Sequence, residues 1–150
     1  MAGEETDGDA MTQIASLTDA FFRAVSFQDG GRPEYSRIHE LFIDRGLLIK
    51  NSADPPTVST VEEFIAPRQA LVEAGQLTSF REAELGHRTD IFGRVAHRLS
   101  TYVKHAVTDG TPSEIRGVIS TQFVQTSTGW LISSMAWDDE RPGLTVPELR

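Results

Sequence analysis

The first half of the chain carries its apolar residues at helical spacing. Between Ile14 and Val25 they recur every three or four positions, which predicts an amphipathic helix over residues 12–27. Pro33 suits a first helical position and predicts a second, shorter helix after it. A short strand is expected next, over residues 47–50.

A third helix should begin at Ser59 or Thr60. Thr60 and Glu63 have the spacing of a capping box, in which each residue satisfies an unpaired amide of the helix start. Pro67 is expected to kink or restart this helix, and Gly75 suits its C-terminal end. The helical period stops at that glycine.

Beyond Gly75 the apolar residues alternate with a period of two, as they do in β-strands. This predicts long antiparallel strands, with a hairpin turn at the Asp109-Gly110 pair. Apolar residues occur on both faces of these strands, although an antiparallel sheet usually has one face in water. We therefore expect helices on the concave face and a second copy of the chain on the outer face. The strands are expected over residues 77–87, 94–107, 115–125 and 130–137.

Composition limits the classes of function. The chain has 150 residues, a net charge of −8 and no cysteine, which argues against nucleic acid as a partner and excludes disulfides and thiolate metal sites. The length allows a single domain over residues 11–150, after a disordered acidic tail over residues 1–10. Neither a signal peptide nor a membrane span is recognisable. We expect a soluble, cytoplasmic protein without a membrane partner.

The end of the chain carries a family resemblance. Residues 129–143, Gly-Trp-Leu-Ile-Ser-Ser-Met-Ala-Trp-Asp-Asp-Glu-Arg-Pro-Gly, and the order of the elements resemble the nuclear-transport-factor-2-like superfamily, which includes SnoaL-like proteins and ketosteroid isomerases. Residues 92–97 and 116–122 resemble bacterial members in particular. The resemblance implies an α+β, cystatin-like cone fold, with three N-terminal helices packed on a strongly curved antiparallel sheet. This fold hosts both enzymes and binding proteins.

The resemblance also locates the catalytic positions of the ketosteroid isomerases. By order and spacing, their helical tyrosine falls at Phe21 or Phe22, their general base at Asn51 and their late-strand aspartic acid at Thr121. None of these side chains supplies the group that the isomerase reaction needs. Steroid isomerisation by that mechanism is not expected.

His97 and Asp138 are the candidate acid–base residues. His97 alternates with apolar residues on the strand face that we assign to the pocket, and imidazole titrates near neutral pH. Asp138 is expected at the mouth of the cone. The alternatives are structural: a core histidine satisfied by a neighbouring group, and a charged strand end before a Pro-Gly turn.

Glu82 and Glu84 lie two positions apart on one strand face. They could form a carboxylate pair in which one pKa is raised. The alternative is that they form a solvated strand face or pair with Arg98 or Arg116 across neighbouring strands.

These observations predict a homodimer that binds a small, largely apolar molecule between the first helix, the third helix and the concave sheet. The histidines lack the spacing of metal ligands and no nucleotide motif is present, so neither metal nor cofactor is expected. Two alternatives remain open: a proton-transfer enzyme of isomerase, dehydratase or cyclase type, and an interaction protein that uses the outer sheet face. The expected pocket residues are Phe21, Asn51, Phe64, Leu99, Thr121, Phe123 and Trp137.

Overall fold

The computed structural model describes residues 6–149. The chain begins with helix α1 (Asp7–Val25) and a 3-10 helix, η1 (Tyr35–Leu41). Strands β1 (Phe42–Lys50) and β2 (Thr57–Thr60) separate these from helix α2 (Val61–Glu73). Four long strands follow: β3 (Leu77–Phe92), β4 (Val95–Thr108), β5 (Thr111–Thr126) and β6 (Gly129–Asp139).

The six strands form one sheet in the order β2-β1-β6-β5-β4-β3. Neighbours are antiparallel except β1 and β6, which run parallel. The expectation of an antiparallel sheet is therefore correct for the long strands and wrong at this junction. Strand β2 was not expected, and because it precedes α2, the helices do not all come before the sheet.

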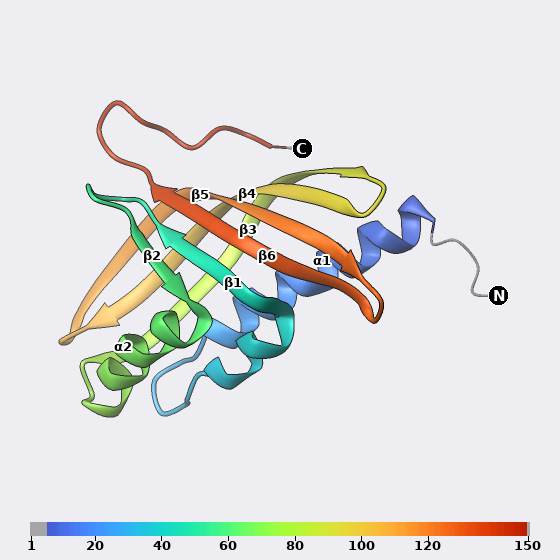
Figure 1. Cartoon of the computed structure of the whole chain (residues 1–150). Coiled ribbons are helices and arrows are strands. Elements are labelled where there is room, and N and C mark those ends of the chain that lie inside the picture. Colours follow the sequence, from blue (N-terminus) through green and yellow to red (C-terminus); the bar gives the residue numbers. More distant parts are fainter. Residues whose placement is uncertain (1–5, 150) are drawn as a thin grey trace.

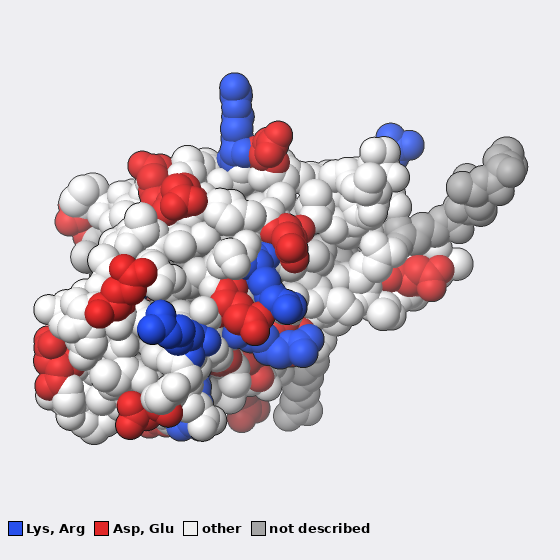
Figure 2. Space-filling view, turned by 90° about the horizontal axis from the view of Figure 1, so that it is seen from below, with Lys and Arg blue, Asp and Glu red and all other residues white. Residues whose placement is uncertain are grey.

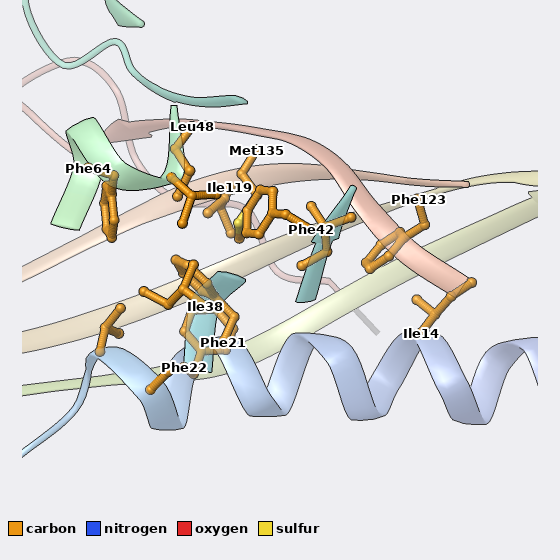
Figure 3. Close-up of a cluster of buried hydrophobic side chains, with 14 of the residues drawn as sticks. Ile14, Phe21, Phe22, Ile38, Phe42, Leu48, Phe64, Ile119, Phe123 and Met135 are labelled. Carbon is orange, nitrogen blue, oxygen red and sulfur yellow. The ribbon is translucent and has the colours of Figure 1, made fainter. Parts of the chain in front are cut away.

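The helices lie on one side of the curved sheet, and the segment after β6 runs along the other side (Figure 1). Helix α1 contacts β3 and β6, whereas α2 contacts β1 and η1. Apolar side chains fill the space between the two layers (Figure 3). A site on the concave face is thus enclosed by sheet and helices together.

Helix α1 starts earlier than the sequence pattern predicts. The hydroxyl of Thr6 accepts a hydrogen bond from the Asp9 amide at 3.1 Å, and the acidic residues of the first turn suit the positive end of the helix dipole. The predicted disordered tail over residues 1–10 is therefore wrong for residues 7–10, which are helical. Residues 1–5 lie outside the described part of the chain.

Helix α2 has the predicted capping box: Glu63 N–H donates to Thr60 Oγ1 at 3.1 Å, and Thr60 N–H donates to Glu63 Oε1 at 3.0 Å. Pro67 neither breaks nor restarts the helix, which runs through it. Pro67 is exposed, so the carbonyl that loses a partner there can bond to water. Gly75 ends the segment with a φ of 73°, a conformation that favours glycine.

The turn between β4 and β5 is the predicted one. Asp109 and Gly110 have φ values of 51° and 78°, as a two-residue hairpin turn requires. The register that follows from this turn fixes which β4 residues share a face with which β5 residues, and so decides what reaches the concave side.

Candidate functional site

A cavity of about 150 Å³ lies between the helices and the concave face of the sheet. Its lining comes from α1, η1, α2 and most of the strands. Lys50, at the end of β1, is its exposed member, whereas the others are buried or half-buried. The lining residues are Phe21, Val25, Tyr35, Lys50, Phe64, Arg68, Leu77, Phe80, Glu82, Lys104, Ile119 and Trp137.

Aromatic rings form one part of this lining. The Phe64 ring lies 6.2 Å from Phe21 and 6.0 Å from Trp137, centroid to centroid, and meets Trp137 edge to face. Figure 3 shows Phe21 on α1 and Phe64 on α2 facing the sheet. Such ring pairs prefer these offset geometries, so the helices and the sheet hold the aromatic wall rigidly.

Arg68 lies above this wall. Its guanidinium carbon is 3.7 Å from the centre of the Phe64 ring, and Nη1 donates to the Phe64 carbonyl at 2.9 Å. Burial lowers the pKa of Arg68, against the opposing effects of Tyr35 and Glu82. The cation is thus fixed by its own helix and keeps donors for another group.

Glu82 on β3 lies opposite Lys104 on β4. Its backbone N–H donates to Ser26 Oγ at 3.1 Å, but its carboxyl forms no hydrogen bond with any group in residues 6–149. The pKa of Glu82 is raised to about 7: burial is the main cause and the charge of Asp139 adds to it, whereas Lys104 and Arg68 act to lower it. This carboxyl therefore titrates near neutral pH.

Asp139 on β6 does not line the cavity but forms an ion pair with Lys104, which does. Its Oδ1 lies 3.1 Å from Lys104 Nζ and accepts a hydrogen bond from the Tyr102 hydroxyl at 2.5 Å. Tyr102 and Asp139 both pair with Gly117, which lies between them in the sheet. A side chain at Gly117 would occupy the place of the phenol, so the glycine permits this bond across two strands.

Glu84 has the opposite surroundings. It accepts two hydrogen bonds from Arg98, at 3.0 and 2.6 Å, and one from Ser100 at 2.6 Å. Burial acts to raise the pKa of Glu84, but these hydrogen bonds outweigh it and hold the pKa below its usual value. The expected cross-strand pair with Arg98 is thus present for Glu84 but not for Glu82.

Three of the expected pocket residues line the cavity: Phe21, Phe64 and Trp137. Thr121 and Phe123 are buried on the same sheet face but outside the lining. In Figure 3, Phe123 lies toward the Ile14 end of the core and Phe64 toward the other end. The concave face is longer than the cavity, so sharing that face does not bring a residue to the site.

Asn51 and Leu99 are placed differently from what we expected. Asn51 is exposed just beyond β1, where its N–H donates to the Trp137 carbonyl at 2.9 Å; its neighbour Lys50 lines the cavity instead. Leu99 pairs with Ser120 and lies on the outer face. Neither residue lines the cavity.

The placement of His97 in the pocket is wrong. His97 pairs with Gln122, whereas Ile119 on the concave face pairs with Ser100, so His97 points to the outer face. Its side chain is 54% exposed, and Nε2 lies 2.8 Å from Asp90 Oδ2. Alternation in the sequence indicates which residues share a face within one strand. It does not indicate which residues of the neighbouring strand lie on that same face.

Asp138 is also on the outer face. It pairs with Val118, while its neighbours Trp137 and Asp139 alternate to the concave side. Arg141 Nη1 donates to Asp138 Oδ1 at 2.7 Å, and this bond lowers the pKa of the carboxyl. The residue that reaches Lys104 and Tyr102 is thus Asp139, one position later.

Four charged residues of the cavity were not expected to line it: Lys50, Arg68, Glu82 and Lys104. The strand pattern contains part of the signal, because alternation from Tyr102 predicts Lys104 on the same face. No comparable signal marks Arg68, whose position depends on how α2 packs. Among residues 6–149, no group of three or more histidine, aspartate or glutamate side chains is arranged to hold a metal ion.

Comparison with solved structures identifies the fold. Kfla4162 from Kribbella flavida superimposes with a TM-score of 0.74 at 17% identity, over 93% of this chain and 98% of that one. A nuclear-transport-factor-2-like protein from Salmonella enterica gives 0.74 at 11% identity, over 95% of this chain and 100% of that one. The chain has the nuclear-transport-factor-2-like fold.

An NTF2-like protein with a cystatin-like fold from Novosphingobium aromaticivorans gives a TM-score of 0.66 at 14% identity, over 91% of each chain. No protein-family model matches the sequence, and no curated protein matches it. Within residues 6–149, no helix is long and apolar enough to cross a membrane. The resemblance seen in the sequence is confirmed at the level of the NTF2-like fold.

Proposed function

We propose that the protein binds a small, largely apolar molecule in the cavity between α1, α2 and the concave sheet. The observation that supports this most is the wall of Phe21, Phe64 and Trp137 beside a cavity of about 150 Å³. An apolar cavity of about this size in another protein accommodates benzene. The ligand therefore has the size of one ring with short substituents.

A thermal-shift screen with single-ring compounds tests this proposal. A ligand at a hundredfold excess over its Kd stabilises the folded state by about 2.7 kcal/mol, so at least one compound should raise the melting temperature by several degrees. Phe64→Ala should abolish that shift. Phe22→Ala is the matched control, because Phe22 is as buried as Phe64, at 5% exposure each, but does not line the cavity.

Both variants should lose stability in the absence of ligand, since both remove a buried ring. Only Phe64→Ala should also lose the response to ligand. A screen without any stabilising compound, or an equal loss of response in both variants, would contradict the proposal.

A second copy of this chain remains the proposed partner on the outer face. Leu85 and Val95 there are 51% and 53% exposed, which is high for apolar strand residues. Residues 145–149 already cover part of the face near Gly86, so the proposed interface uses the rest. Sedimentation equilibrium should show a dimer, and a monomer at micromolar concentration would contradict it.

Proton transfer in this cavity gains no support from His97 or Asp138, because both point to the opposite face of the sheet. Binding is the function that the lining supports best.

A further inference from the structure

The charges in the cavity differ from those of the whole chain. The chain has 14 basic and 22 acidic residues, and acidic side chains are spread over the face seen in Figure 2, with some Lys and Arg near its middle and others at its upper edge. The cavity lining has three basic residues, Lys50, Arg68 and Lys104, and one acidic residue, Glu82. In this acidic protein, most of the charged residues that line the cavity are thus cations.

These cations are only partly neutralised. Lys104 is paired with Asp139 at 3.1 Å. Neither Lys50 nor Arg68 has a carboxylate oxygen within 4.0 Å among residues 6–149. With Glu82 ionised the group of five charges sums to +1, and with Glu82 neutral it sums to +2. A buried positive potential of this kind favours an anion.

We propose that the cavity binds a single-ring aromatic carboxylate, with its ring among Phe21, Phe64 and Trp137 and its carboxylate at Arg68 and Lys104. This inference rests on the proposed function and adds the chemical class of the ligand. The guanidinium of Arg68 supports a carboxylate in particular, because its planar fork of donors matches two oxygens. Its contact with Phe64 places that fork beside the aromatic wall.

Glu82 makes the binding dependent on pH. The protonated carboxyl can donate a hydrogen bond to a bound carboxylate, whereas the ionised form repels it. Because the pKa of Glu82 is raised to about 7, the protonated fraction falls about tenfold from pH 6 to pH 8. Affinity for the anion should fall by up to the same factor.

Other titratable groups surround Glu82. Tyr35 on η1, Arg68 on α2, Lys50 on β1 and Lys104 on β4 line the same cavity, and Asp139 pairs with Lys104.

On the other side of Glu82, a groove next to α1 has further charged groups in its lining: Asp19, Arg23, Glu84, Arg98, Arg81 and His105. Asp19 and Arg23 pair at 2.6 Å, and Glu84 pairs with Arg98. His105 lies 3.6 Å from Glu114, so a His105 variant serves as a control for the Glu82 variant.

Calorimetric titration with benzoate and with benzamide tests the inference. The two probes have nearly the same shape, and only benzoate is charged. At pH 6 benzoate should bind at least about tenfold more tightly than benzamide, because it alone meets the cations. Between pH 6 and pH 8 its affinity should fall up to about tenfold, while that of benzamide should not change.

Three variants complete the experiment. Arg68→Met should lose the preference for benzoate and retain benzamide binding, whereas Arg88→Met, which changes an exposed arginine of β3 outside the cavity, should behave as wild type. Glu82→Gln should remove the pH dependence. His105→Gln should retain it.

The outcomes separate the two proposals. Benzamide binding as tightly as benzoate would overturn the carboxylate inference and leave the proposed function intact. A pH dependence that persists in Glu82→Gln would overturn the role of Glu82. If no single-ring compound binds, neutral or charged, both proposals fail.

Discussion

Glu82 and Glu84 are two positions apart on the same face of β3, yet they have opposite surroundings. Glu84 accepts three hydrogen bonds, from Arg98 and Ser100, and its pKa is held low against the effect of burial. Glu82 accepts none from the described residues, and burial raises its pKa to about 7. Glu84 is thus held by hydrogen bonds within the fold, whereas Glu82 borders the cavity.

The difference has two causes: burial dominates at Glu82, where no hydrogen-bond donor opposes it, whereas the donors Arg98 and Ser100 stabilise the ionised form of Glu84. A pair of acids driven apart in pKa is typical of sites that bind or transform a ligand. Glu84 has its partners already, so it is a structural residue. The carboxyl of Glu82 can still form hydrogen bonds, and it lines the cavity.

Removing the charge of Glu84 should have the largest effect. Glu84→Gln leaves the buried guanidinium of Arg98, whose side chain is 6% exposed, without its counter-ion, and breaking such a pair costs about 3–5 kcal/mol. Urea unfolding at pH 7 should show this loss. Because the pKa of Glu84 is lowered in the folded state, the difference in the free energy of unfolding between wild type and variant should shrink as pH falls below about 4.5.

Glu114→Gln is the matched control, because Glu114 is an acidic strand residue whose side chain is 56% exposed. Its substitution should change stability by less than about 1 kcal/mol. Equal costs at both positions would show that the Glu84 and Arg98 pair does not differ from a surface pair.

For Glu82→Gln, the pH dependence of this stability difference should have the opposite sign. The folded protein holds the Glu82 proton up to about pH 7, whereas the unfolded chain releases it near pH 4.5. Wild type therefore loses stability relative to the variant as pH rises through this window, by about 3 kcal/mol in total, and the difference stays constant above it. Urea unfolding of both proteins from pH 4.5 to pH 8 measures this slope.

His97→Gln provides the comparison for that slope, because His97 is an ionisable side chain on the outer face of the sheet. His97 is exposed and pairs only with Asp90 at 2.8 Å; its substitution should leave the slope unchanged. A slope that disappears in His97→Gln and persists in Glu82→Gln would assign the titration to the outer face and remove the contrast between Glu82 and Glu84.

The smallest effect is expected from Asp139→Asn, which should make Glu82 more like Glu84. The charge of Asp139 raises the pKa of Glu82, and its loss also leaves Lys104 free to pair with Glu82. The pKa of Glu82 should fall, with a stability cost of about 1 kcal/mol because the amide can still accept from Tyr102. NMR titration of the Glu82 carboxyl carbon measures the change, and an upward shift would contradict it.

The helices and long strands follow from the sequence because local signals mark them. Thr60 with Glu63, Gly75, and Asp109 with Gly110 each specify backbone geometry within a few residues, and each is present as expected. The parallel pairing of β1 with β6 joins residues far apart in the chain. No local pattern encodes such a contact, so the edge of the sheet was not predicted.

The cavity was predicted only in part. Phe21, Phe64 and Trp137 follow from the fold that the sequence resembles. The Asp109-Gly110 turn sets the register of β4 and β5, and the expected faces differ from that register by one residue, which placed His97 on the concave side and Lys104 away from it. Asp138 was expected at the mouth of the cone, but it lies on the outer face, and Asp139 shares the concave side with Trp137.

The cavity lining includes residues from α1, η1, α2 and every strand except β2. A bound molecule therefore contacts both the helices and the hydrogen-bonded strands of the sheet, in segments from Phe21 to Trp137. Local opening of any one of these elements would disrupt its site, so binding should slow amide hydrogen exchange across nearly the whole chain rather than around one loop. Such a ligand would act as a non-covalent cross-link of the fold.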